Sequence, residues 1–243
     1  MSLPALLELP INTQGHDFVV GDLHGCRHLL EAQLQSLGFN AAVDRVISVG
    51  DLIDRGPDSW NTLRLIEEPW FHFVLGNHEE MLLGLLEASN GPWSVDPESA
   101  WINNLNPDQI NHLRRVLVPI LEAAPLAIKV GSGDDTYFVI HADRTQKSAS
   151  NPYQLVPDHA LGDALDEDEH LRSSALWSRR LFKDLPADTH AQSGVLVTEP
   201  ANEFGVSLTY VGHSVVSAPV LFRSHLFIDT GAYETGVLTV LRV

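Results

Sequence analysis

Acidic, amide and imidazole side chains recur in this sequence directly after short apolar runs. Asp22 and His24 follow the run at 18–20, and Asp51 follows the run at 46–49. Short runs rich in β-branched and aromatic residues are typical of buried strands, so each polar group is expected just beyond a strand. The arrangement recurs after the runs at 71–75, 137–140 and 208–211. The full set of candidate metal ligands is Asp22, His24, Asp51, Asn77, His141 and His213.

This set mixes oxygen and imidazole donors. Such a mixture suits Mn, Fe or Zn better than Mg or Ca alone, and no thiolate takes part. Two acids, an amide and three imidazoles exceed the needs of one ion, but they fit two ions about 3.5–4 Å apart that share a carboxylate. The sequence therefore predicts a dinuclear centre, preferably of Mn, with Asp51 as the candidate bridge.

Neighbouring side chains could complete the hydrolysis of a phosphoester. Two metal ions lower the pKa of a bound water and hold the phosphoryl oxygens, so no nucleophile from the protein is needed. Arg55 could supply positive charge to the equatorial oxygens. His78, next to Asn77, is placed to protonate the leaving alkoxide, and Asp54 could orient the His78 imidazole and favour its protonated form.

Each motif also has an ordinary structural explanation when taken alone. Asp22 and His24 could be a turn acid and a surface histidine, and Asn77 could cap a helix. Asp51 and Asp54 could form a local salt bridge with the arginine that follows. His141 and His213 could be hydrogen-bonded core histidines. Their occurrence together, each at the end of an expected strand, favours one shared site.

The elements expected around these residues form an α/β frame. Helical patterns at 28–37 and 59–66 lie between the first three strands and indicate a βαβαβ unit of an open sheet, whose ligands bind beyond the carboxyl ends of the strands. Apolar residues at helical spacing predict a helical hairpin at 92–124 beside the sheet. The acidic, turn-rich stretch at 145–203 is expected to be peripheral. We expect one catalytic domain over 1–243.

Composition excludes several classes of function. A net charge of -17 disfavours binding to nucleic acid and to anionic membranes. No apolar run approaches the roughly 20 residues that cross a bilayer, and residues 1–10 lack the features of a signal peptide. The one cysteine, Cys26, cannot form an intramolecular disulfide and is expected to be a packed small residue. These observations predict a soluble cytoplasmic protein without a membrane or nucleic-acid partner.

Three motifs at 21–25, 50–56 and 76–79, followed by His141 and by Gly212-His213, resemble the phosphoprotein phosphatase family of calcineurin-like metallophosphoesterases. The resemblance extends from about residue 18 to 231. The segments 177–179 and 228–232 are similar in particular to the small bacterial and phage (lambda-type) Ser/Thr protein phosphatases. The resemblance implies a phosphoprotein substrate and a four-layer α/β/β/α sandwich that carries a helical insertion.

The resemblance also assigns roles to individual residues. One metal ion would be held by Asp22, His24 and Asp51, and the other by Asp51, Asn77, His141 and His213. His78 would be the general acid supported by Asp54, and Arg55, Asn77 and Arg179 would contact the substrate phosphate. Asp229 and Gly231 match a late motif and are interpreted as a hydrogen-bonded turn under the site.

Two other functions compete with a Ser/Thr phosphatase that could also accept phosphotyrosine. Diadenosine tetraphosphate hydrolases resemble this chain in the same segments, but they usually have a small residue in place of Asp54 and Asp in place of Glu79. A non-catalytic metal-binding interaction module usually lacks some ligands or the acid, whereas this chain keeps the set. The loop after His141 and the stretch 186–204 match nothing, so the substrate specificity stays open.

Overall fold

Two β-sheets form the centre of the molecule. The computed structural model describes residues 5–89, 91, 93–146, 154–185, 196–198 and 205–243. The smaller sheet has parallel strands β2, β3 and β4, with β13 antiparallel to β2 at its edge. These strands are β13 (Val240–Arg242), β2 (Asp17–Val20), β3 (Arg45–Ser48) and β4 (Phe71–Phe73).

The larger sheet is mixed. Strands β6, β10 and β12 run parallel at its centre, and β5 and β11 are antiparallel to their inner neighbours. In spatial order its strands are β1 (Leu6–Leu9), β5 (Ala127–Val130), β6 (Tyr137–Ile140), β10 (Leu208–Val211), β12 (His225–Phe227), β11 (Val220–Phe222) and β9 (Leu196–Thr198). A short ribbon pairs β7 (Thr145–Gln146) with β8 (Gln154–Leu155).

The two sheets face each other across an apolar core. Val19 and Ile47 of the smaller sheet share a buried cluster with Ile128 and Val139 of the larger sheet. Because side chains alternate along a strand, the neighbours of Val19 point to the opposite face. Phe18 is one of these neighbours, and it packs against the outer helices.

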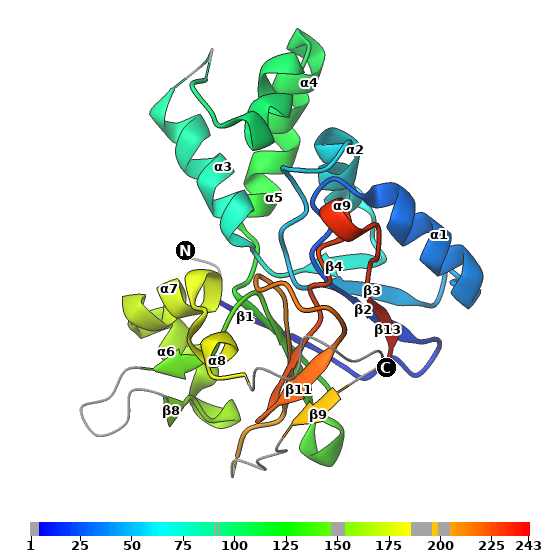
Figure 1. Ribbon diagram of the computed structural model, residues 1–243, viewed down its shortest axis with the longest axis vertical. Helices are drawn as coiled ribbons and strands as arrows, with labels where there is room; N and C mark the ends of the chain where they lie inside the picture. Colours follow the sequence, from blue (N-terminus) through cyan, green and yellow to red (C-terminus); the bar gives the residue numbers. More distant parts are fainter. Residues whose placement is uncertain (1–4, 90, 92, 147–153, 186–195, 199–204) are drawn as a thin grey trace.

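Helices cover the outer face of each sheet (Figure 1). The smaller sheet is covered by α1 (Arg27–Leu37), α2 (Ser59–Leu63), η1 (Arg64–Glu67), α3 (Asn77–Ala88), η2 (Pro97–Asn104), the π-helical η3 (Leu113–Leu117) and α5 (Val118–Glu122). Helix α4 (Pro107–His112) lies farther from the sheet and has no buried residue (Figure 1). The larger sheet is covered by α6 (Leu161–Glu167), α7 (Glu169–Trp177) and α8 (Arg180–Lys183). Shorter elements are η4 (Gly133–Asp135), η5 (Asp158–Ala160) and α9 (Ala232–Thr235).

This layering confirms the four-layer α/β/β/α sandwich. The six expected strands are present, and the first three form the parallel unit that the residue pattern indicated. Strands β2, β3 and β4 build the smaller sheet, whereas β6, β10 and β12 belong to the larger one. The segment 92–124 is helical over η2, α4, η3 and α5, and α5 lies beside α3 (Figure 1). No helix in the described part of the chain is long and apolar enough to cross a membrane.

Candidate metal centre and catalytic site

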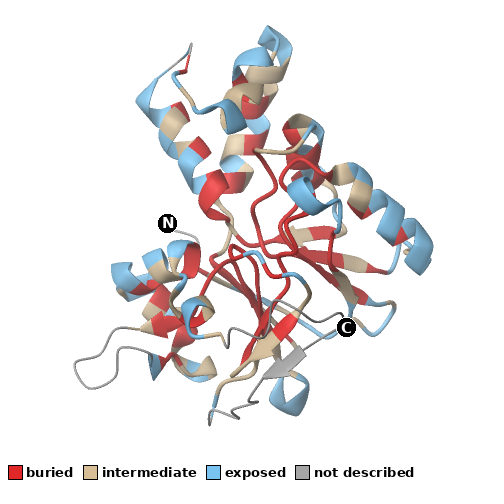
Figure 2. Cartoon of the chain, in the orientation of Figure 1, coloured by how far each residue is buried: buried red, intermediate tan, exposed pale blue. Residues whose placement is uncertain are grey.

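The loops that follow β2, β3, β4, β6, β10 and β12 meet at one end of the two sheets. Figure 2 shows this region as buried chain in the middle of the molecule. Backbone hydrogen bonds join the loops: the amides of Leu23 and His24 donate to the Asp51 carbonyl at 3.0 and 2.8 Å. Segments far apart in the sequence are therefore held together by main-chain hydrogen bonds as well as by their side chains.

The backbone of these loops is strained at the predicted functional positions. Five of the six non-glycine residues with positive φ in the described chain belong to the predicted site. They are His24, Asp51, Asp54, Arg55 and His213. Such conformations cost about 1–3 kcal/mol each and concentrate at functional sites, where the surrounding structure holds them.

Close approach of the loops also requires glycine at two positions. Gly50 has φ 95°, and a Cβ atom there would lie 2.7 Å from the Gly76 nitrogen. A Cβ atom on Gly212 would overlap the Asp22 carboxylate. The glycines in these motifs let four ligand-bearing loops come into contact in two pairs.

The six predicted ligands lie together and are all buried. One Asp51 oxygen, Oδ2, is 3.5 Å from His24 Nε2, and the other, Oδ1, is 3.5 Å from His141 Nε2. Asn77 Oδ1 is 2.9 Å from His141 Nε2 and 2.8 Å from His213 Nδ1. Asp51 therefore lies between two groups of donors, in the position that a bridging ligand needs.

The orientation of two histidines fits metal binding. His24 Nδ1 is 2.8 Å from the Ile53 carbonyl, and His141 Nδ1 is 2.7 Å from the Val49 carbonyl. When Nδ1 carries the proton, the Nε2 lone pair of His141 faces the oxygens of Asp51 and Asn77, so acceptors face one another. A cation between them removes this repulsion, and a backbone bond on the opposite nitrogen is the usual support of a metal-bound histidine. The donor set therefore fits divalent metal ions.

The ionisation of the site agrees with this interpretation. Burial raises the pKa of Asp22 well above its usual range, and the negative charges of Asp229 and Asp51 act in the same direction. Burial lowers the pKa of His24 to about 4 and that of His213 to about 3. Neutral imidazoles are ready to bind a metal ion, and clustered buried carboxylates need positive charge to stay ionised.

The described residues contain two groups of possible metal ligands, and the donor atoms within each group lie within 4.8 Å of one another. One combines Asp51 with His141 and His213, as expected for one ion. The other combines Asp51 with His24 and His78, so it contains the predicted general acid and not Asp22. Asp22 is nevertheless in the site, because its carboxylate accepts the His213 amide at 3.0 Å.

His78 and Asp54 form a hydrogen-bonded pair beside the ligands. His78 Nδ1 is 2.7 Å from Asp54 Oδ2, and the indole of Trp101 donates to Asp54 Oδ1 at 2.7 Å. Although burial opposes protonation, the hydrogen bond to Asp54 and the charges of Asp51 and Asp54 raise the pKa of His78. The carboxylate is thus held from both sides, and it favours a protonated imidazole.

The two predicted phosphate-binding arginines also reach the site. Arg55 Nη1 is 2.8 Å from His24 Nε2, and its guanidinium lies 5.1 Å from the centre of the Tyr233 ring. Arg179 donates to the His213 carbonyl at 3.2 Å. All ten predicted site residues therefore lie in one region, and their catalytic and ligand roles stay predictions.

Glu79 has no role predicted from the sequence, although this residue holds the site together. Its buried carboxylate accepts the amides of Asp51, Leu52, Ile53 and Gly76 at 2.8–3.3 Å. Glu79 is also the third residue of α3, where an acidic side chain commonly completes a capping box. That helix-start signal is a local feature of the sequence that could have indicated a structural role for it.

We expect Glu79→Gln to destabilise the fold by about 1–3 kcal/mol, because an amide leaves some of these buried N–H groups without a good acceptor. The free energy of unfolding from urea titration measures the effect. Glu87→Gln is the matched control, since Glu87 is exposed on the same helix. Equal stability of the two variants would contradict this role for Glu79.

Comparisons with known proteins agree with this geometry. A family model described as calcineurin-like phosphoesterase matches residues 18–217. Serine/threonine-protein phosphatase 2 of Salmonella typhimurium is 32% identical over 229 residues, which cover 94% of this chain and 93% of that protein. The symmetrical bis(5'-nucleosyl)-tetraphosphatase of Nitrosomonas europaea is 34% identical over 168 residues, which cover 58% of this chain and 59% of that protein.

Among solved structures, a cold-active protein-tyrosine phosphatase of a psychrophilic Shewanella species aligns with a TM-score of 0.59. The alignment has 18% sequence identity and covers 98% of this chain and 77% of that one. At this identity the likeness supports the fold alone.

Proposed function

Because this chain belongs to the calcineurin-like phosphoesterase family, we propose that it is a metal-dependent phosphatase for phosphoserine and phosphothreonine in proteins. The observation that carries the proposal is the position of the His78–Asp54 pair beside the Asp51-centred ligand group. A phosphomonoester of serine or threonine has a poor leaving group, so its hydrolysis needs a proton donor in addition to metal ions.

The residues divide into ligands and substrate contacts. Asp22, His24 and Asp51 would hold one divalent ion, and Asp51, Asn77, His141 and His213 the other, with Mn favoured and Fe or Zn as alternatives. When bound, the ions supply a nucleophilic water and neutralise charge on the phosphoryl oxygens.

The remaining residues bind the phosphate and move the proton. Arg55 and Arg179, together with Asn77, would bind the phosphoryl oxygens as negative charge spreads over them. His78 would give the proton on Nε2 to the leaving oxygen while Nδ1 stays bonded to Asp54. We further propose that the enzyme acts on phosphoproteins in the cytoplasm, in line with the single buried Cys26.

A dinucleoside polyphosphate hydrolase is the second candidate, because the Nitrosomonas europaea relative carries that name. The Salmonella typhimurium phosphatase is 32% identical over 94% of this chain, whereas the Nitrosomonas europaea hydrolase is 34% identical over 58% of it. Asp54 also favours the phosphatase, since it has a defined position on His78 and is usually replaced by a small residue in the hydrolases.

The test is a comparison of two substrates on the purified protein with Mn. We expect kcat/KM for a phosphothreonine peptide to exceed that for diadenosine tetraphosphate by at least about tenfold. Excess chelator should abolish turnover, and added Mn should restore it. The opposite order of substrates would make the dinucleotide the substrate class, and turnover that resists exhaustive chelation would remove the metal-dependent scheme.

A further inference from the structure

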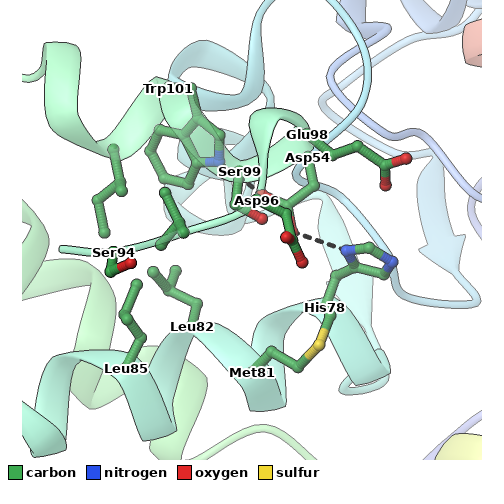
Figure 3. A pocket seen from close by; sticks show the side chains of 12 residues that line it. Asp54, His78, Met81, Leu82, Leu85, Ser94, Asp96, Glu98, Ser99 and Trp101 are labelled. Carbon is green, nitrogen blue, oxygen red and sulfur yellow. Dashed lines mark hydrogen bonds and ion pairs between the residues drawn. The ribbon is translucent and has the colours of Figure 1, made fainter.

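A cavity of about 340 Å³ opens directly beside His78, between α3 and η2 (Figure 3). His78 and Asp54 form one end of it. Met81, Leu82 and Leu85 of α3 line one wall. These positions follow His78 at intervals of three, four and seven residues, which lie on one face of a helix. The same face of α3 therefore carries the predicted general acid and an apolar surface.

The opposite wall is formed by η2 and the chain before it. Val95, Trp101 and Ile102 line this wall, and Ile102 is fully buried. Trp101 is fixed by its hydrogen bond to Asp54. Two apolar walls with a defined separation are typical of a preformed binding pocket.

The rim of the pocket is acidic. Asp96 and Glu98 are exposed at its mouth, and none of the described residues that line it is Lys or Arg. Glu98 is 3.2 Å from Arg55, whereas the Asp96 side chain makes no capping hydrogen bond at the start of η2. The pocket therefore offers apolar walls below a rim that attracts a cation.

The location of the pocket relates it to one part of the substrate. In the proposed function, Arg55 and Arg179 face the phosphate, and His78 faces the leaving oxygen. His78 Nδ1 faces Asp54, which lines the pocket, whereas Nε2 lies 4.0 Å from Asp51 Oδ2 on the other side of the ring (Figure 3). Residues next to the phosphorylated one would reach the pocket by passing over the His78–Asp54 pair. We infer that the pocket is a specificity site that binds an apolar side chain and an adjacent Lys or Arg next to the phosphorylated residue of a protein substrate. The inference rests on the proposed function.

The charge of the pocket argues for this occupant and against a nucleotide. The leaving group of a dinucleoside polyphosphate carries further phosphates, which would lie close to Asp54, Asp96 and Glu98 without a lysine or arginine in the lining. A basic peptide meets the same carboxylates with the opposite sign.

The experiment uses a set of alanine-based heptapeptides with a central phosphothreonine. The two positions on one side of it carry Leu and Arg, Ala and Arg, or Leu and Glu, and a second set places the same pairs on the other side. Phosphate release gives kcat/KM for each peptide. On at least one side we expect the wild-type protein to prefer Leu over Ala by about tenfold and Arg over Glu by about fivefold.

Two variants test which residues cause these preferences. Asp96→Lys should bring the Arg-to-Glu ratio to one or below, and Met81→Gln should reduce the Leu-to-Ala ratio by about threefold. Both side chains are exposed, so the fold should tolerate the changes. Glu87→Lys on the far side of α3 and Val116→Gln on η3 are the matched controls, and they should keep both wild-type ratios.

The possible outcomes distinguish failure of the pocket assignment from failure of the proposed phosphatase function. Equal kcat/KM for all peptides, or ratios that persist in Asp96→Lys and Met81→Gln, would overturn the pocket assignment and leave the phosphatase proposal standing. Hydrolysis of diadenosine tetraphosphate without hydrolysis of any peptide would overturn both. Preferences that shift as much in the control variants would also exclude a role for this pocket.

Discussion

Asp51→Asn is expected to lower kcat for phosphothreonine peptides by about a thousandfold and to reduce the bound metal. Asp51 directs one oxygen at His24 and the other at His141, each at 3.5 Å, so no other described side chain can serve both donor groups in the same way. An asparagine keeps the shape but loses the charge and one oxygen ligand. Metal-ion catalysis contributes several kcal/mol, and each factor of ten corresponds to about 1.4 kcal/mol.

Metal content gives a readout that does not depend on turnover. Elemental analysis after equilibration with Mn and gel filtration should give two ions per wild-type chain and one or fewer per Asp51→Asn chain. Asp134→Asn, a change in the exposed turn η4, should match the wild type in both metal content and rate. An Asp51→Asn variant that retains two ions and full activity would exclude the bridging role.

The candidate ligands could be found from the sequence because their signal is local. Asp22, Asp51 and His141 each follow an apolar run within a few residues, and the structure has a strand at each run. Strand pairing is not local, so the residue pattern could not show that the six strands divide between two sheets. Nothing within β6 or β10 reveals that these strands pair with each other and not with β3.

Several strands lacked a readable pattern. The sequence of β1 is LLEL, with no β-branched residue, and β5 is a run of four residues that includes Lys129. Each finds its place through the other, since Leu6 to Leu9 pair in register with Ala127 to Val130. Propensity is a weak guide where pairing with a distant segment decides the conformation.

Site residues that do not follow a strand could not be identified from the residue pattern. Trp101 lies within the segment predicted as a helical hairpin and packs against the core, but its indole also donates to Asp54, 47 positions earlier in the chain. Arg179 lies between α7 and α8, and only the family resemblance identified it. Its contact with the His213 carbonyl depends on how the helical layer docks on the larger sheet. Contacts between layers follow from the tertiary fold, and no short motif encodes them.

His78→Asn should slow the enzyme in proportion to how poor the leaving group is. For a phosphothreonine peptide the loss of a positioned acid should cost about 10²–10⁴-fold in kcat. For p-nitrophenyl phosphate, whose leaving group needs little protonation, the loss should stay below about tenfold. The two metal ions should remain bound in the variant, since His78 is proposed as an acid and not as a ligand.

Asp54→Asn gives a graded test of the same assignment. Asp54 contacts His78 at 2.7 Å and is held by Trp101, so an amide there should weaken the acid without removing the imidazole. We expect a smaller loss than in His78→Asn, with the same dependence on the leaving group. His78 also lies close enough to His24 and Asp51 to bind a metal ion with them. The variants can therefore show whether His78 is an acid or a metal ligand. Equal slowing of both substrates together with loss of one ion would make His78 a metal ligand, and the proton would then have to come from another group.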